Sequence, residues 1–351
     1  MAVPTAKPVW EDKMKLRTLL STVGAVAIAA SISTSAGAAG PTIIKMGSYT
    51  PPKAGHLRKI IIPWLRKVEA DSAGTVKFQE FWGGALIRSP RKQWEGMQNG
   101  IQDASTIIPA YTSKLFPDFT YYSLPFLFQG TGSVEGTVVG WEMYKRGLLG
   151  GLDNVHVAAV YANDNGGIHF NRKINTLADI KGLKVRVPGP GQAKVLKQLG
   201  LVPVGMGARQ VAESLNRGVI QGALMGWSAL SIFRVTPLLK SHVDLPMGTR
   251  SFFVGIHKRV YDKLPRAGKA AVDKNSGLDF SMSLGTYYER DGTKLRTNSG
   301  SRNVVRPDAA AQKELFKKFK PFHDAWQKNV KDGAKKYQAI QEILAKHRGS
   351  S

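Results

Sequence analysis

Strand-like and helix-like segments alternate along the first hundred residues, and this alternation restricts the folds open to the chain. Residues 42–49 and 76–81 have the short apolar pattern of strands. Between them, residues 57–70 place apolar side chains at helical spacing, and a second helical stretch at 94–99 ends at Gly100. A repeated strand–helix order predicts an α/β fold with mixed, mostly parallel sheets flanked by helices.

A strand in the middle of the chain carries a candidate binding residue. Residues 183–187 alternate apolar and basic side chains, and Pro and Gly at 188–191 separate them from a helical stretch at 192–199. Arg186 therefore lies near the carboxyl end of a strand. Ligands of open α/β sheets bind outside the carboxyl ends of the strands, so Arg186 is a candidate ligand contact.

The length of the chain and a weak internal repeat predict two lobes. A chain of 351 residues exceeds what a single core usually holds. Segments 96–104 and 213–221 share a helical stretch, a glycine and a strand start. We expect the chain to cross between the lobes near residues 160 and 250. The expected limits are 40–162 with 250–291 for the first lobe, and 163–249 with 292–351, including the C-terminal helices, for the second.

Residues 1–39 have the pattern of a secretory signal peptide. Lys15 and Arg17 precede an apolar run at 19–32, which small residues follow. The run has roughly 14 residues, short of the ~20 that span a bilayer. We therefore expect export to the periplasm. The residues before Met14 do not fit a signal peptide, so we expect translation to start at Met14.

Composition excludes several classes of function. The chain has no cysteine, so disulfides and thiolate chemistry are absent. The net charge of +25 comes from Lys and Arg that are spread along the chain, without a basic block or a nucleic-acid-binding motif. We expect no nucleic-acid partner. A basic protein of this kind is consistent with an anionic ligand.

Catalytic and cofactor motifs are missing from the sequence. The seven histidines are scattered without metal-ligand spacing, and no nucleophile elbow or phosphate-binding loop is present. We expect a binding protein that is not an enzyme and that needs no metal or cofactor. Two alternatives stay open, namely an exported enzyme acting on a small organic acid and a ligand-sensing subunit of a membrane receptor.

Five segments, in this order and spacing, resemble the extracytoplasmic solute receptors of TRAP (tripartite ATP-independent periplasmic) transporters, and are similar to their dicarboxylate-receptor branch. The segments are 124–128, 170–174, 179–187, 215–222 and 261–265. The resemblance runs from about residue 42 to about residue 345. It implies a two-lobed, type II-like periplasmic binding protein fold that closes on an organic carboxylate. It also implies delivery to the transporter's membrane subunits, and we expect the receptor to be a monomer.

The resemblance also assigns a role to Arg186, because the matching arginine of these receptors binds the ligand carboxylate. A planar guanidinium suits this role, since it offers two parallel donors to a carboxylate. Two departures concern the rest of the ligand. Many such receptors carry another arginine about twenty residues before this one, but residues 163–169 of this chain contain none. Many also carry a polar run at the place where residues 221–227 of this chain are largely apolar.

From these departures we expect an apolar or aromatic monocarboxylate or keto acid. Aromatic and apolar side chains would supply the walls of such a site, and His169 and Tyr49 would donate to a hydroxyl or keto oxygen. The predicted ligand-binding residues are Arg186, Trp227, Met225, His169, Tyr49, Trp82, Tyr111 and Phe253, with Phe252 as a further wall.

Overall fold

The computed structural model describes residues 2, 40–298 and 303–350. The predicted signal peptide and the predicted start at Met14 lie outside the described residues, apart from Ala2. Among the helices described, none has both the length and the apolar character needed to cross a membrane.

In the part of the chain that the structure describes, the strands form two sheets. The first sheet has the strand order β2-β1-β3-β10-β4, and the second has the order β11-β9-β5-β8-β6-β7. The strands of the first sheet are β1 (Thr42–Gly47), β2 (Val76–Phe81), β3 (Ala104–Ile107), β4 (Val155–Ala162) and β10 (Ser251–His257). Those of the second are β5 (Gly166–Phe170), β6 (Lys184–Val187), β7 (Val202–Gly205), β8 (Gly222–Gly226), β9 (Ser241–Val243) and β11 (Asn303–Val305).

Both sheets are mixed, as the sequence predicts. Among the described strand pairings, five are parallel and four are antiparallel. The antiparallel pairs arise where the chain enters one sheet from the other. Strand β4 leads directly into β5, and β10 returns from the second sheet to pair with β3 and β4. The predicted two-lobed α/β fold is confirmed, with one lobe built on each sheet.

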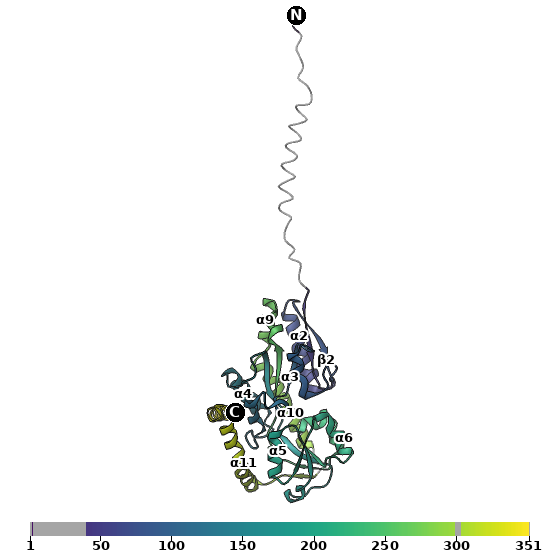
Figure 1. Ribbon diagram of the computed structural model, residues 1–351, viewed down its shortest axis with the longest axis vertical. Coiled ribbons are helices and arrows are strands. Elements are labelled where there is room, and N and C mark those ends of the chain that lie inside the picture. Colours follow the sequence, from purple (N-terminus) through teal and green to yellow (C-terminus); the bar gives the residue numbers. More distant parts are fainter. Residues whose placement is uncertain (1, 3–39, 299–302, 351) are drawn as a thin grey trace. The chain divides into compact units, whose positions relative to one another are not determined.

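Helices cover the faces of both sheets (Figure 1). The α-helices are α2 (Ile62–Asp71), α3 (Gln93–Gln98), α4 (Ser133–Lys145), α5 (Pro190–Gln198), α6 (Val211–Asn216), α7 (Trp227–Ile232), α8 (Lys258–Tyr261), α9 (Arg266–Asn275), α10 (Leu278–Thr297), α11 (Ala309–Asn329) and α12 (Gly333–Gly349). A π-helical turn, η1 (Leu57–Ile61), precedes α2. The 3₁₀ turns are η2 (Pro90–Lys92), η3 (Pro109–Thr112), η4 (Pro117–Ser123), η5 (Leu177–Ile180), η6 (Ala208–Gln210) and η7 (Thr236–Leu238).

The internal repeat corresponds to two similar helix–strand joints. Helix α3 ends before Gly100 and leads to β3, and α6 ends before Gly218 and leads to β8. Both glycines have left-handed backbones, with φ of 77° and 69°. Glycine adopts this conformation without the steric cost that a side chain imposes. The strands that follow begin at Ala104 and Gly222, four residues after each glycine.

Strand β10 separates two parts of the hydrophobic core of the first lobe. Phe252, Val254 and Ile256 pack in the cluster that contains Ile44 of β1. Phe253 packs on the other face, in the cluster formed with α4 and α12. This division follows from the alternation of side chains along a strand.

The two C-terminal helices bridge the lobes. Phe319 of α11 belongs to the core of the second sheet, whereas Trp326 of the same helix and Ile340 of α12 belong to a core cluster of the first. Asp308 begins α11 by accepting a hydrogen bond from the N–H of Ala311 at 2.8 Å, as an N-cap does. The residue limits expected for the two lobes stay a prediction.

Candidate functional site

A cavity lies between the two lobes. Clefts between lobes or domains are frequent binding sites for small organic ligands. The residues that line it come from both lobes and are Tyr49, Thr50, His56, Ile108, Tyr111, Asn163, Arg186, Ala208, Met225, Ser228, Ala229, Ile232, Phe233, Arg250, Phe252 and Tyr288.

Arg186 of β6 is a buried cation in this cavity, with 2% of its surface exposed. The neighbouring Val185 and Val187 point into the core of the second lobe, so alternation along β6 turns Arg186 to the opposite face. Burial lowers the pKa of Arg186 to about 10, which leaves the guanidinium charged at neutral pH.

Within the described residues, the hydrogen-bond partners of the Arg186 side chain are neutral oxygens. Nε donates to the carbonyl of Met206 at 2.9 Å, and Nη1 donates to the carbonyl of Leu224 at 3.1 Å. Nη2 donates to the hydroxyl of Tyr111 at 3.2 Å. No carboxylate of the described residues forms an ion pair with Arg186. The bonds fix the orientation of the guanidinium without neutralising its charge.

A second arginine of the cavity, Arg250, was missed by the sequence analysis. It lies at the entry to β10, near the predicted chain crossing, and is 6% exposed. Its backbone N–H donates to Oδ1 of Asn163 at 3.0 Å. Within the described residues, its Nη1 is buried without a hydrogen-bond partner. Burial lowers the pKa of Arg250.

Arg250 alters one step of the sequence argument. The expectation of a monocarboxylate rested on the absence of an arginine from residues 163–169, and Asn163 of that stretch does line the cavity. The cavity nevertheless contains two guanidinium groups, because the second comes from a distant part of the chain. The absence of an arginine from 163–169 is therefore no argument against a second acceptor on the ligand.

Asp164 is a buried carboxylate behind the cavity wall. The backbone N–H of Ser228 donates to its Oδ2 at 3.0 Å, and the Ser228 hydroxyl donates to Oδ1. Burial raises the pKa of Asp164 to about 6, while the hydrogen bonds from Ser228 and the charge of Arg250 act in the opposite direction. Asp164 is therefore mostly ionised at neutral pH and offsets one positive charge of the cavity.

Apolar and aromatic side chains form the remaining walls. Ile108, Ile232 and Phe233 line the cavity together with Phe252, whose ring stacks on Tyr161 with centroids 5.0 Å apart. Such a surface accommodates a flat or apolar ligand body.

The structure brings four of the eight predicted ligand-binding residues to the cavity, and Phe252 with them. These four are Arg186, Met225, Tyr49 and Tyr111. The other four are absent from the lining. Phe253 packs edge-on against Trp94 and Phe116, at centroid distances of 6.1 and 5.7 Å, because it lies on the opposite face of β10 from Phe252. Trp82 donates from Nε1 to the Glu80 carboxylate at 2.8 Å.

His169 and Trp227 lie in a buried cluster behind Met225. Nε2 of His169 contacts the carbonyl of Met225 at 3.1 Å, and Nδ1 of His169 contacts Nδ1 of His242 at 2.7 Å. A carbonyl only accepts, so His169 carries its proton on Nε2, and His242 donates from Nδ1. The ring of Trp227 packs 4.8 Å from that of His169. His169 therefore holds the backbone carbonyl of Met225, a residue that lines the cavity.

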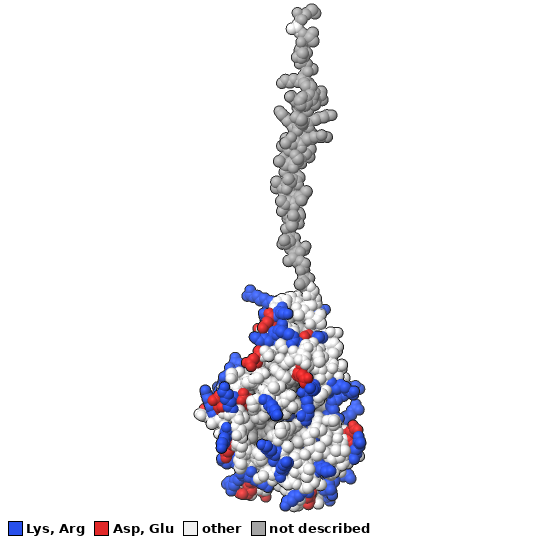
Figure 2. All heavy atoms as spheres, viewed as in Figure 1, with Lys and Arg blue, Asp and Glu red and all other residues white. Residues whose placement is uncertain are grey.

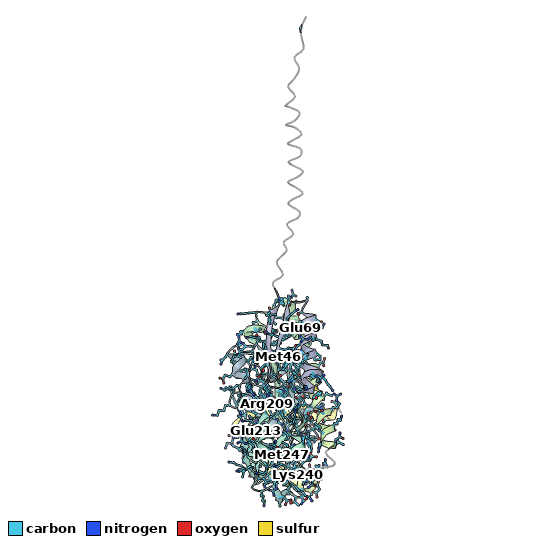
Figure 3. All side chains as sticks on the ribbon, turned by 90° about the vertical axis from the view of Figure 1, so that its right-hand side faces the viewer. Met46, Glu69, Arg209, Glu213, Lys240 and Met247 are labelled. Atoms are coloured by element: carbon cyan, nitrogen blue, oxygen red, sulfur yellow. The ribbon has the colours of Figure 1, made fainter. Side chains whose placement is uncertain are left out.

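Hydrogen bonds close the two lobes on each other near the cavity. Arg209 of η6 donates from Nη1 to the carbonyls of Tyr49 and Gly83, at 2.9 and 3.0 Å. Figure 3 shows Arg209 between Met46, on β1 of the first sheet, and Met247, in the core of the second lobe. Arg91 donates across the same boundary to the carbonyl of Pro188 at 3.3 Å. The two lobes are therefore closed on each other at the cavity.

Charged side chains are spread over the surface of the part of the chain that the structure describes. Figure 2 shows Lys and Arg over much of the visible face, with Asp and Glu between them. Across the described residues, no group of three His, Asp or Glu side chains is placed to hold a metal ion.

Two lobes on mixed sheets, joined by chain crossings and enclosing a cavity with buried arginines, define a solute-binding protein. The family model for bacterial extracellular solute-binding proteins, family 7, matches residues 47–329. The chain belongs to this family, and the predicted resemblance to TRAP solute receptors is confirmed.

Solved structures of TRAP solute-binding proteins have the same fold. One, from Rhodoferax ferrireducens in complex with copurified benzoate, is 26% identical, with a TM-score of 0.81 over 88% of this chain and 99% of that chain. Another, from a marine metagenome and specific for aromatic acid ligands, contains 3-hydroxybenzoate; it is 26% identical, with a TM-score of 0.80 over 88% and 99% of the two chains.

A curated relative, the uncharacterized protein YiiZ of Salmonella typhimurium, is 29% identical over 186 residues, which cover 48% of this chain. The match spans about half of that relative's length, 52%.

Proposed function

We propose that this chain is a periplasmic receptor that captures a small organic monocarboxylate and delivers it to the membrane subunits of a TRAP transporter. It binds its ligand between the lobes without chemical turnover. Arg186 holds the carboxylate, and the aromatic and apolar walls of the cavity hold the ligand body.

The observation that carries this proposal is the uncompensated charge of Arg186. Its hydrogen bonds go to two carbonyls and a phenol. A buried cation with only neutral partners is costly, and an anion relieves this cost. A carboxylate matches the guanidinium best because each charge-assisted hydrogen bond contributes about 1.5–3 kcal/mol.

The aromatic walls narrow the ligand class. Phe233, Phe252 and Tyr111 give the cavity flat surfaces on which an aromatic ring packs. Two similar receptors contain benzoate and 3-hydroxybenzoate. We therefore place aromatic monocarboxylates first among the ligands to test.

A thermal-shift screen of the purified protein tests the ligand class. The probes are benzoate, phenylacetate, 4-methylpentanoate and succinate, each paired with its uncharged amide. A ligand present at 100 times its Kd stabilises the folded state by ~2.7 kcal/mol, which raises the melting temperature measurably. We expect shifts with one or more of the monocarboxylates and none with the matched amides. Equal shifts with acid and amide, or shifts with succinate alone, would refute the proposal.

A further inference from the structure

Arg250 has a buried donor for which the described protein supplies no acceptor. Its side chain lines the cavity, and its Nη1 lacks a hydrogen-bond partner among the described residues. The backbone position is fixed, because the N–H of Arg250 donates to Asn163 Oδ1 at 3.0 Å and to Thr249 Oγ1 at 2.6 Å. A buried side-chain donor inside a binding cavity is satisfied when the ligand brings an acceptor.

The charges around the cavity decide which kind of acceptor fits. Arg186 and Arg250 are positive, and Asp164 behind the wall supplies one negative charge. His56 is neutral, because burial lowers its pKa to about 4. Burial raises the pKa of Tyr49 and Tyr288, which are neutral as well.

With Asp164 ionised, these buried groups carry one net positive charge, and the charge of Arg91, which also acts on Arg186, is screened because Arg91 is exposed to solvent. One carboxylate on the ligand balances it. A second carboxylate would leave a buried negative charge without compensation, which is unfavourable.

We propose that Arg250 determines specificity by donating a hydrogen bond to an uncharged oxygen of the ligand, a hydroxyl or keto oxygen, while Arg186 holds its single carboxylate. The ligand is then a hydroxy- or keto-monocarboxylate. This inference rests on the function proposed above and extends it from the carboxylate to the second polar group of the ligand.

Isothermal titration calorimetry with matched probes tests this role. The probes are benzoate, its 2-, 3- and 4-hydroxy derivatives, and isophthalate, together with phenylacetate and its keto analogue phenylglyoxylate. For the wild type we expect at least one hydroxy or keto acid to bind about tenfold more tightly than its unsubstituted partner, which corresponds to ~1.4 kcal/mol. Isophthalate should bind more weakly than the best of them.

The variant Arg250→Met should lose this preference, leaving less than a twofold difference, because it weakens the binding of the hydroxy or keto acid more than that of the unsubstituted acid. Arg250→Lys keeps the positive charge and is the second variant to measure if Arg250→Met does not fold. It should reduce the preference at least threefold. Arg217→Met, at an exposed arginine on the surface, is the matched control and should leave the preference unchanged.

The outcomes separate this inference from the function on which it rests. If no acid binds the wild type, the proposed function fails, and the role of Arg250 with it. If acids bind but Arg250→Met weakens both members of a pair equally, Arg250 holds the carboxylate or supports the fold, and the inference is wrong. An unchanged preference in Arg250→Met, or tightest binding of isophthalate, also overturns it while the carboxylate receptor stands.

Discussion

Arg186 and Tyr111 form a hydrogen bond across the boundary between the lobes, with Nη2 of Arg186 3.2 Å from the hydroxyl of Tyr111. Arg186 belongs to β6 of the second sheet, and Tyr111 belongs to η3, which follows β3 of the first. The side chain proposed to hold the ligand carboxylate is thus bonded directly to the opposite lobe. In the proposed function, ligand capture and lobe closure therefore share one residue.

Replacing Tyr111 by phenylalanine should weaken ligand binding by removing this bond. A single hydrogen bond of this kind contributes about 0.5–1.5 kcal/mol. We expect the Kd for the best carboxylate to rise roughly three- to tenfold in titration calorimetry. The control is Tyr261→Phe, whose hydroxyl bonds Asp273 at 2.7 Å outside the cavity. Equal affinities of the two variants would show that the bond contributes nothing to the bound state.

Gly189 should be needed for full closure of the lobes. A Cβ at this position would lie 2.8 Å from the carbonyl oxygen of Ala110 in the other lobe. Both sides of this contact belong to the backbone, which cannot shift without a large cost in free energy. Gly189→Ala should therefore hold the lobes apart. We expect weaker ligand binding, with a radius of gyration in small-angle X-ray scattering that no longer falls on addition of ligand.

Gly205→Ala is the matched control, since a Cβ there meets nothing within 4 Å. It should bind and close as the wild type does. A Gly189→Ala protein that binds with wild-type affinity would contradict the closed arrangement of Gly189 and Ala110.

Asp164 should make stability depend on pH in a definite direction. Its pKa in the folded protein is raised from 3.8 to about 6 by burial. Between these values the folded protein binds more protons than the unfolded chain, so the contribution of Asp164 to the free energy of unfolding falls as pH rises from about 4 to about 6. The loss is of order 3 kcal/mol above pH 6.

Other buried groups also change stability in this pH range, because a buried neutral histidine such as His56, whose pKa burial lowers, destabilises the folded protein as pH falls. Comparison with Asp164→Asn cancels these contributions and isolates that of Asp164. Melting temperatures of both proteins, measured from pH 4 to pH 8, should show the wild type losing stability relative to the variant across pH 4–6. A difference that is constant with pH would mean that Asp164 titrates normally.

The fold was largely predictable because its signals are local. The strand at 76–81 was predicted with the limits that β2 has in the structure, since Val76, Phe78 and the polar residues between them alternate clearly. The N-terminus of α11 follows from Asp308, which caps the helix. Arg186 was expected near the carboxyl end of a strand, and it lies there in β6. In each case a few neighbouring residues determine the feature.

The other cavity residues depend on tertiary packing, which local patterns do not encode. Strand β10 is buried on both faces, so its apolar sequence does not distinguish Phe252, in the cavity, from Phe253, in the core. His169 and Trp227 were predicted as ligand contacts because of their chemistry, but they lie behind Met225. Arg250 reaches the cavity through a chain crossing, and the only sequence signal was its position near that crossing.

The central claim is that Arg186 holds the ligand carboxylate, and titration calorimetry of Arg186→Met with the best-binding carboxylate tests it most directly. Loss of two charge-assisted hydrogen bonds should raise the Kd at least ~100-fold. The ligand-free variant should stay folded, because methionine fills the site without a buried charge. Arg217→Met, which removes an exposed arginine, should bind as the wild type does. An Arg186→Met protein that binds within threefold of the wild type would contradict the account.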